Sequence, residues 1–209
     1  MKTRTKALCA VFLITASALP AAAVLKTGDP FLPFALRAVD GRNIIVTMDA
    51  GRLTLIVETT AAGKTERKTS HPSAVLLDFW ATWCLPCRTG MPYMQKLHDT
   101  YRARDDRDSG GLSLFGIALD LRGSAVVKPF FQKLKFTYAM LADPVPGLSD
   151  PKLLRTAQDM GEKYDAQEIP VVYLIDTKGR IRHVHMGFKV EHFADLEKTV
   201  AGLIAEDNK

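Results

Sequence analysis

Short apolar runs recur along the chain, and they predict a series of strands. The run at residues 75–79 is almost wholly aliphatic and aromatic, which is typical of a strand buried on both faces. A second run of this kind covers residues 112–119, and Pro170 opens another. Shorter runs predict the remaining strands, at residues 34–36, 44–47, 53–59, 136–141 and 181–186.

Other segments place apolar residues three and four positions apart, which is the spacing of one helix face. They predict helices over residues 84–104, 124–135, 152–164 and 190–206. Pro92 should kink the first helix, and Ser124 should cap the second. Because proline is tolerated in the first turn of a helix, Pro129 indicates that the regular part of the second helix begins after Ser124. The residues expected to be buried on the second and last helices are Val127, Phe130, Phe131, Leu134, Phe193, Leu196, Val200 and Leu203.

A polar segment precedes the run at residues 75–79. Residues 60–72 are rich in charged residues, threonine and glycine without an apolar period, so they are expected to form a solvated loop. Asp40 and Gly41 are a turn signal between two of the expected early strands. The pattern therefore predicts a β-hairpin, followed by a loop, ahead of the main run.

Two cysteines lie directly after the run at residues 75–79, where the chain changes from strand to helix. A helix N-terminus offers unsatisfied backbone N–H groups, which lower the pKa of a thiol below its free value of about 8.5. Cys84 is therefore the expected nucleophile, and Cys87, one turn later, can close a disulfide with it. Pro86 suits an early helical position that needs no N–H donor. A four-cysteine zinc site needs a second pair, which the chain lacks, so the motif predicts a redox dithiol.

The segment around these cysteines resembles the active site of the thioredoxin superfamily. The matching residues are Asp78-Phe79-Trp80-Ala81 and Trp83-Cys84-Leu85-Pro86-Cys87. The early hairpin and the additional helix and strand at residues 124–141 are similar to the TlpA and ResA branch, whose members are exported thiol-disulfide oxidoreductases.

This resemblance implies an α/β fold. The expected architecture is a thioredoxin-like three-layer sandwich with a mixed central sheet, an N-terminal β-hairpin extension and an inserted helix and strand. The expected organisation is a signal peptide at residues 1–23, the β extension at residues 24–72 and the thioredoxin-like domain at residues 73–209.

The resemblance also implies a client-binding surface around the dithiol. In the superfamily, the peptide bond that matches Ile169-Pro170 is cis and lies beside the dithiol. A client peptide would pair with the backbone of Ile169 as it does with an edge strand. Trp83 and Pro86 are expected to contribute to client binding. Trp80 and Trp83 either shield the dithiol and form a flat docking surface or belong to the core.

Attack by Cys87 requires a base, because a thiol in apolar surroundings keeps its proton. Thioredoxin has a buried aspartate on the strand before the dithiol, and the matching residue here is Asp78. Many TlpA and ResA-like proteins instead have a glutamate three residues after the second cysteine, and that position is Gly90 here. Asp78 is therefore the expected base, and the alternative is a buried acid without a role in the chemistry.

The N-terminal residues have the composition of an export signal. Three basic residues precede an apolar stretch at residues 7–19 and three alanines at residues 21–23. The segment is either cleaved or kept as an anchor, and in both cases the folded part is expected in the periplasm or elsewhere outside the cytoplasm. Removing residues 1–23 lowers the net charge from +5 to +2, so the charge does not indicate a nucleic-acid partner.

The expected function is the reduction of protein disulfides through Cys84 and Cys87, and cytochrome c maturation is one role of the related branch. The expected partners are client proteins with disulfides and a membrane protein that donates electrons, because the periplasm is oxidising. No cofactor and no metal are expected. One alternative is a thiol peroxidase, which is disfavoured because Ala81 stands where the peroxiredoxin pattern has a threonine. The other is a non-enzymatic module that binds a metal or a client.

Two histidines and a methionine near the end of the chain suggest a copper site as a further possibility. His183 and His185 share one face of the expected strand, whereas Met186 lies on the other face. Exposed polar positions on an edge strand are therefore the favoured interpretation of the two histidines.

Overall fold

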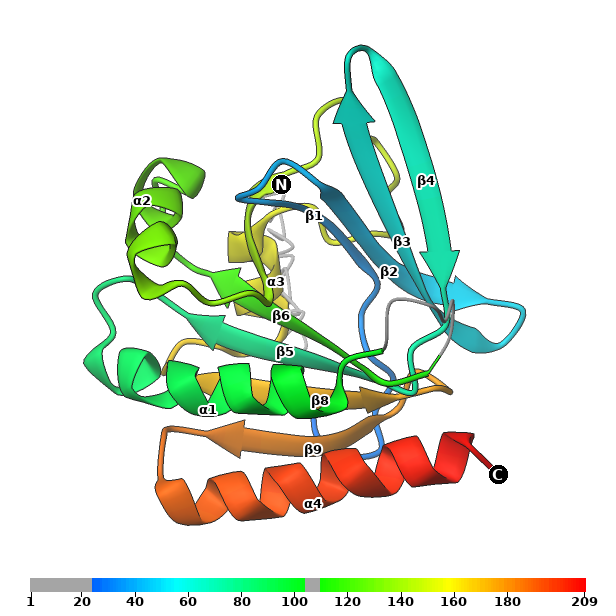
Figure 1. Cartoon of the computed structure of the whole chain (residues 1–209), viewed down its shortest axis with the longest axis vertical. Coiled ribbons are helices and arrows are strands. Elements are labelled where there is room, and N and C mark those ends of the chain that lie inside the picture. Colours follow the sequence, from blue (N-terminus) through cyan, green and yellow to red (C-terminus); the bar gives the residue numbers. More distant parts are fainter. Residues whose placement is uncertain (1–23, 104–109) are drawn as a thin grey trace, which may run out of the picture.

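The computed structural model describes residues 24–103 and 110–209 (Figure 1). The expected export signal, residues 1–23, lies outside the described residues. The strands of the described part are β1 (Phe34–Ala38), β2 (Asn43–Asp49), β3 (Arg52–Ala61), β4 (Lys64–Ser70), β5 (Ala74–Trp80), β6 (Leu112–Ala118), β7 (Ala139–Pro144), β8 (Val171–Asp176) and β9 (Ile181–Met186). The helices of the same part are α1 (Leu85–Tyr101), α2 (Ser124–Leu134), α3 (Ala157–Lys163) and α4 (Val190–Asp207).

The described strands form one mixed sheet in the order β4-β3-β2-β1-β7-β6-β5-β8-β9. β5 lies inside this sheet, parallel to β6 and antiparallel to β8, and every residue of β5 is buried. Its side chains alternate between two apolar cores. Val75 and Leu77 pack into the core that contains Met160 of α3, whereas Leu76 and Trp80 pack into the core that α1 and α4 cover.

Helices cover both faces of the sheet, which gives the three layers that the resemblance implies. α1 and α4 lie on one face, and α3 lies on the other (Figure 1). The apolar residues expected to face the core on the last helix are all buried in α4: Phe193, Leu196, Val200 and Leu203. Pro92 lies inside α1 as expected, although α1 ends at Tyr101, earlier than the periodicity predicts.

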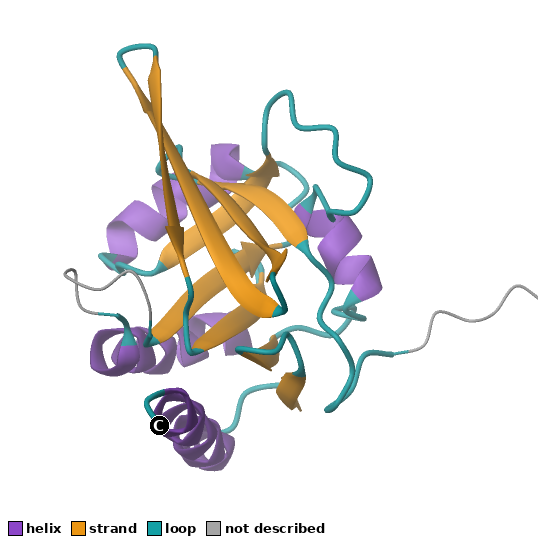
Figure 2. Cartoon of the chain, turned by 90° about the vertical axis from the view of Figure 1, so that its right-hand side faces the viewer, coloured by secondary structure: helices purple, strands orange, loops and turns teal. Residues whose placement is uncertain are grey.

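The N-terminal strands extend the central sheet, because β1 pairs with both β2 and β7. The solvated loop expected at residues 60–72 is wrong, because β4 occupies most of this segment and pairs along its whole length with β3. The β3–β4 hairpin projects from the body of the molecule (Figure 2). β4 is exposed on both faces, so its sequence has no apolar alternation from which a strand can be predicted.

The helix and strand expected between β6 and Pro170 are present as α2 and β7, but several details differ. The residue that caps α2 is Gly123, and the expected cap by Ser124 is wrong: the Ser124 N–H donates to Asp143 Oδ1 at 3.0 Å. Pro129 lies in the middle of α2, which begins at Ser124 and not later. Of the four residues expected on its buried face, Val127 is buried, Leu134 is exposed and the two phenylalanines are partly buried. β7 and α3 each begin a few residues later than the sequence predicts.

Candidate active site

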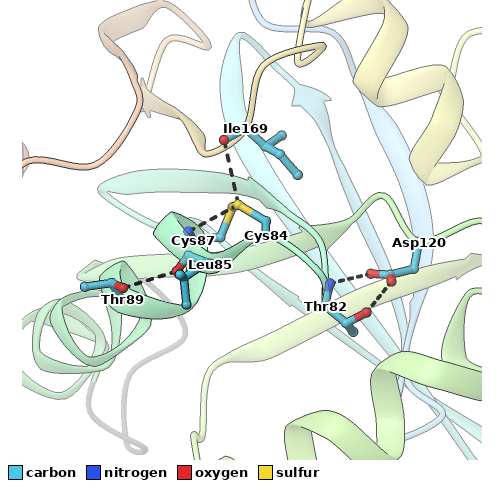
Figure 3. Close-up of a disulfide and its surroundings, with 7 residues drawn as sticks. All are labelled: Thr82, Cys84, Leu85, Cys87, Thr89, Asp120 and Ile169. Carbon is cyan, nitrogen blue, oxygen red and sulfur yellow. Dashed lines mark hydrogen bonds between the residues drawn. A yellow bond between two sulfur atoms is a disulfide. The ribbon is translucent and has the colours of Figure 1, made fainter.

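The two motif cysteines lie where β5 passes into α1. Cys84 is the N-cap residue of α1, and it forms a disulfide with Cys87 with an S–S distance of 1.96 Å (Figure 3). The backbone N–H of Cys87 donates to Cys84 Sγ at 3.2 Å, so the helix N-terminus points a donor at this sulfur. Pro86 occupies an early position of α1, as the sequence predicts. In the reduced form the same donor and the helix dipole favour a thiolate at Cys84.

Asp120, which the sequence reasoning missed, fixes the loop between β5 and Cys84. Its carboxylate accepts hydrogen bonds from the backbone N–H of Thr82 at 2.9 Å and from the Thr82 hydroxyl at 2.6 Å (Figure 3). Asp120 is buried and follows β6, which is parallel to β5. The carboxyl ends of parallel neighbours meet at one edge of the sheet, so an acid just after the apolar run at residues 112–119 was the available signal.

The Ile169-Pro170 peptide bond is cis, which confirms the expectation from the resemblance. The carbonyl oxygen of Ile169 lies 3.7 Å from Cys84 Sγ (Figure 3). Pro170 lines a small cavity together with Cys87. The loop that precedes β8 therefore contacts Cys84 and shares a cavity with Cys87.

The two tryptophans near the dithiol have different surroundings. Trp80 is fully buried and packs against Phe130 of α2, so it is a core residue. Trp83 is 71% exposed and Leu85 is 68% exposed, so both present apolar surface next to Cys84.

A groove of about 350 Å³ lies beside the exposed tryptophan. Trp83 and Ile169 line one part of it, and residues of α3, among them Gln158 and Glu162, line another. The expected client-binding residues Trp83 and Ile169 thus line one groove, whereas Pro170 lines the small cavity that contains Cys87.

Asp78 lies on β5 behind the disulfide, with its side chain on the face that α1 and α4 cover. It is buried, and burial raises the pKa of its carboxyl from 3.8 to about 7. Asp78 and Cys87 line the same cavity, whose volume of about 20 Å³ is sufficient for one water molecule. A carboxyl that titrates near neutral pH next to a buried cysteine is suited to accept a proton from the thiol.

The glycine that replaces the glutamate of the related branch has a structural explanation. A Cβ atom added to Gly90 would lie 2.9 Å from Cδ2 of Phe188, closer than a carbon contact allows. The Phe188 ring packs against Tyr93 at a centroid distance of 5.4 Å, which holds it in that place. The ring therefore occupies the space next to the cavity that a side chain at position 90 would need.

The histidines of β9 are half-buried, so their expected exposure is wrong. His183 and His185 lie on the sheet face that α4 covers, whereas Met186 on the other face is exposed. His185 Nε2 lies 2.9 Å from Nδ1 of His192 on α4, a contact that sequence reasoning did not predict. Among the described residues, no group of three or more His, Cys, Asp or Glu side chains is arranged to hold a metal ion.

The fold and the site together define the class of this protein: it is thioredoxin-like, with a Cys-X-X-Cys disulfide at a helix N-terminus beside a cis-proline. The chain belongs to the AhpC/TSA family, whose model matches residues 56–184.

Curated relatives agree with this assignment. The chain is 27% identical to the thioredoxin-like protein YneN of Bacillus subtilis over 131 residues, which are 63% of this chain and 66% of YneN. It is 30% identical to the thiol-disulfide oxidoreductase ResA of Oceanobacillus iheyensis over 113 residues, which are 54% of this chain and 49% of ResA. The chain thus spans about half to two thirds of the length of these relatives.

Solved structures share the fold. A crystal structure from Chlorobium tepidum, described as a thiol:disulfide interchange protein DsbE, superposes with a TM-score of 0.57 and 23% identity, covering 86% of this chain and 99% of that chain. StoA from Bacillus subtilis gives a TM-score of 0.51 and 19% identity, covering 82% of this chain and 97% of that chain. These neighbours establish the thioredoxin-like fold. Within the described residues, no helix is long and apolar enough to cross a membrane.

Proposed function

We propose that this chain is a thiol-disulfide oxidoreductase that reduces disulfides in client proteins through Cys84 and Cys87. The observation that carries the proposal is the disulfide at the start of α1, with the Ile169 carbonyl on one side and the buried Asp78 on the other. The relatives named thiol-disulfide oxidoreductases support it.

The reaction begins with the reduced dithiol. The Cys84 thiolate attacks one sulfur of a client disulfide, an S–S bond to the client forms, and the other client sulfur leaves with the electron pair of the broken bond. The helix N-terminus and the N–H of Cys87 lower the energy of the Cys84 thiolate. The cis-proline loop and Trp83 bind the client backbone and its apolar side chains.

The second step releases the client. Asp78 takes the proton of the Cys87 thiol, and the Cys87 thiolate attacks Cys84 Sγ. The mixed disulfide breaks, the client leaves as a thiolate that takes a proton from water, and the Cys84–Cys87 disulfide remains. The first client sulfur to leave also takes a proton from water, so overall the client gains two electrons from the dithiol and two protons from solvent. Because the environment outside the cytoplasm is oxidising, the cycle requires a membrane protein that returns two electrons to the disulfide.

The N-terminal composition supports a place outside the cytoplasm, with the folded part either free or held by its own N-terminus. The branch that the chain resembles includes reductases of cytochrome c maturation, and we propose this as one candidate role. Reduced apocytochrome cysteines would then be the product.

The equilibrium reduction potential of the Cys84–Cys87 couple tests the direction of electron flow. A potential near about −270 mV, together with reduction of insulin disulfides, supports a reductase, whereas a potential near about −120 mV contradicts it. Cys87→Ser is the matched control, since it should trap the mixed disulfide and abolish turnover.

Thiol peroxidase activity is the second candidate function, and it is supported by the match to the AhpC/TSA family. Ala81 in place of the peroxiredoxin threonine weighs against it. Turnover of hydrogen peroxide with a thiol donor, at rates above those of Cys84→Ser, would establish the peroxidase in place of the reductase.

A further inference from the structure

We propose that His185 and His192 form a proton relay that connects Asp78 with solvent during the release of the client. The inference rests on the proposed function, because it assigns a path for the proton that Asp78 takes from Cys87.

The relay is positioned by two elements that are far apart from β5 in sequence. β9 is the edge strand next to β8, and α4 lies beside β9 (Figure 1). His185 is on the face towards α4, because its ring contacts His192 of that helix. His185 is paired with Val172 of β8, and Val172 is paired with Asp78 of β5. The strand register thus places Asp78 and His185 in one row across the sheet, two strands apart.

One cavity connects these groups. Asp78 and Cys87 line its buried part, and both histidines line it as well. Lys189, which is exposed, also lines the cavity, so the cavity extends from the buried carboxyl towards the surface. Its volume of about 20 Å³ is sufficient for one water molecule that could bridge a carboxyl and an imidazole.

The two imidazoles are placed to pass a proton between them. His185 Nε2 and His192 Nδ1 are 2.9 Å apart, and the ring centroids are 4.2 Å apart. At this distance one nitrogen carries the hydrogen and the other accepts it. His185 also has a hydrogen bond with the Gly187 backbone, which raises its pKa and so favours the protonated ring that a relay passes through. A proton accepted by one ring of the pair can be released from the other.

The surroundings of His185 favour its neutral form before the proton arrives. Burial lowers the pKa of His185, and the neighbouring His192 and His183 lower it further. Lys189 acts in the same direction, while Asp78 and Cys87 face the pair across the cavity. Asp195 of α4 faces His183. A neutral imidazole beside a newly protonated Asp78 is able to accept its proton.

The proposed step balances without a further redox partner. The proton of Cys87 moves to Asp78 and then, through the cavity, to His185. His185 donates the hydrogen on its Nε2 to Nδ1 of His192, and His192 releases a proton from its other nitrogen to water. Asp78 returns to its carboxylate form, ready for the next cycle, and no electron moves in this step.

The test is the rate at which preformed mixed disulfide between Cys84 and a peptide thiol resolves, measured by stopped flow at low buffer concentration from pH 6 to 8. We expect His185→Gln to slow resolution by about tenfold, less than the loss of a direct general base, because water in the cavity can still exchange protons slowly with Asp78. Added imidazole should restore the rate in proportion to its concentration, which a loss of packing alone would not produce. His192→Gln should give the same defect and the same rescue.

His183→Gln is the matched control, because His183 shares the strand face but does not line the cavity. It removes one group that lowers the pKa of His185, which should not slow proton acceptance. Because both relay rings remain in place, resolution should depend on added imidazole no more than it does in the parent. Equal rates for the parent and both relay variants, or a defect that imidazole does not rescue, would overturn the relay.

Asp78→Asn, measured in parallel, separates this inference from the mechanism on which it rests. If Asp78→Asn is slow while both histidine variants are normal, only the relay fails. If Asp78→Asn resolves at the parent rate, the proposed base fails and the relay fails with it.

Discussion

The two ends of the Cys84–Cys87 disulfide have different surroundings although both cysteines are nearly fully buried. Cys84 lies against the Ile169 carbonyl, next to the exposed Trp83 and the groove along α3. Cys87 faces inward, to a cavity that it shares with Asp78 and His185. We therefore propose a division of tasks, in which the Cys84 end binds the client and the Cys87 end gives up and transfers the proton.

The largest expected effect concerns the Cys87 end and is seen in stability. Because burial raises the pKa of Asp78 from 3.8 to about 7, the unfolded chain ionises this carboxyl at lower pH than the native protein does. Stability should therefore fall as pH rises from about 4 to 7 and then become level. The full loss is roughly 4 kcal/mol at about 1.4 kcal/mol per pH unit.

Asp78→Asn cannot ionise, so the variant should be more stable than the parent at pH 8 and similar to it at pH 4. Urea unfolding of both oxidised proteins at the two pH values measures the difference. If the stabilities of parent and variant differ by the same amount at every pH from 4 to 8, the pKa of Asp78 is not raised in the native protein and the prediction is wrong.

The next largest effect is a difference between the rates of two steps, the attack by Cys84 on the client and the attack by Cys87 on the mixed disulfide. Asp78→Asn should slow the attack of Cys87 on the mixed disulfide by about 100-fold, the lower range for a lost general base. The first attack by Cys84 should change little, because that sulfur is activated by the helix N-terminus. Stopped-flow thiol exchange resolves both steps, and equal slowing of the two would contradict the division.

A smaller effect is expected from the loop that carries Cys84. Asp120→Ala removes the acceptor of two hydrogen bonds and leaves the Thr82 N–H without this partner, at a cost of about 2 kcal/mol. Thr82→Val is the matched control, because it removes the hydroxyl donor alone and should cost about half as much. Denaturant unfolding compares them, and an equal cost would mean that the bond to the backbone contributes nothing.

The smallest effect is expected on the client side. Trp83→Ala should slow attack on a protein disulfide by about threefold, since an exposed aromatic anchor is lost. Attack on a small disulfide such as oxidised glutathione, which makes little contact with this surface, should keep its rate. Leu134→Ala, another exposed apolar residue, serves as the control.

The sequence predicted the strand–dithiol–helix unit because its signals are local. Full burial of β5, the N-cap position of Cys84 and the cis bond before Pro170 all correspond to short motifs. The contacts between distant segments were not predictable in this way. Phe188 fills the space beside Gly90, and His192 contacts His185, only because α4 packs over β9.

The β4 strand was missed for a different reason. Apolar periodicity detects a strand through its burial, and β4 is held by backbone pairing to β3 with neither face in a core. The remaining signal was the turn: Ala62 and Gly63 both have positive φ angles, as a two-residue hairpin requires.

This exposed strand also affects how the protein associates with other polypeptide chains. An open strand edge can pair with an extended segment of another protein. β4 forms one edge of the sheet, and its sequence of lysine, arginine, glutamate and threonine disfavours the addition of another strand. The same polarity that concealed β4 in the sequence therefore disfavours edge-to-edge association with other chains. It is also consistent with the proposal that an extended client binds at the cis-proline loop beside Cys84.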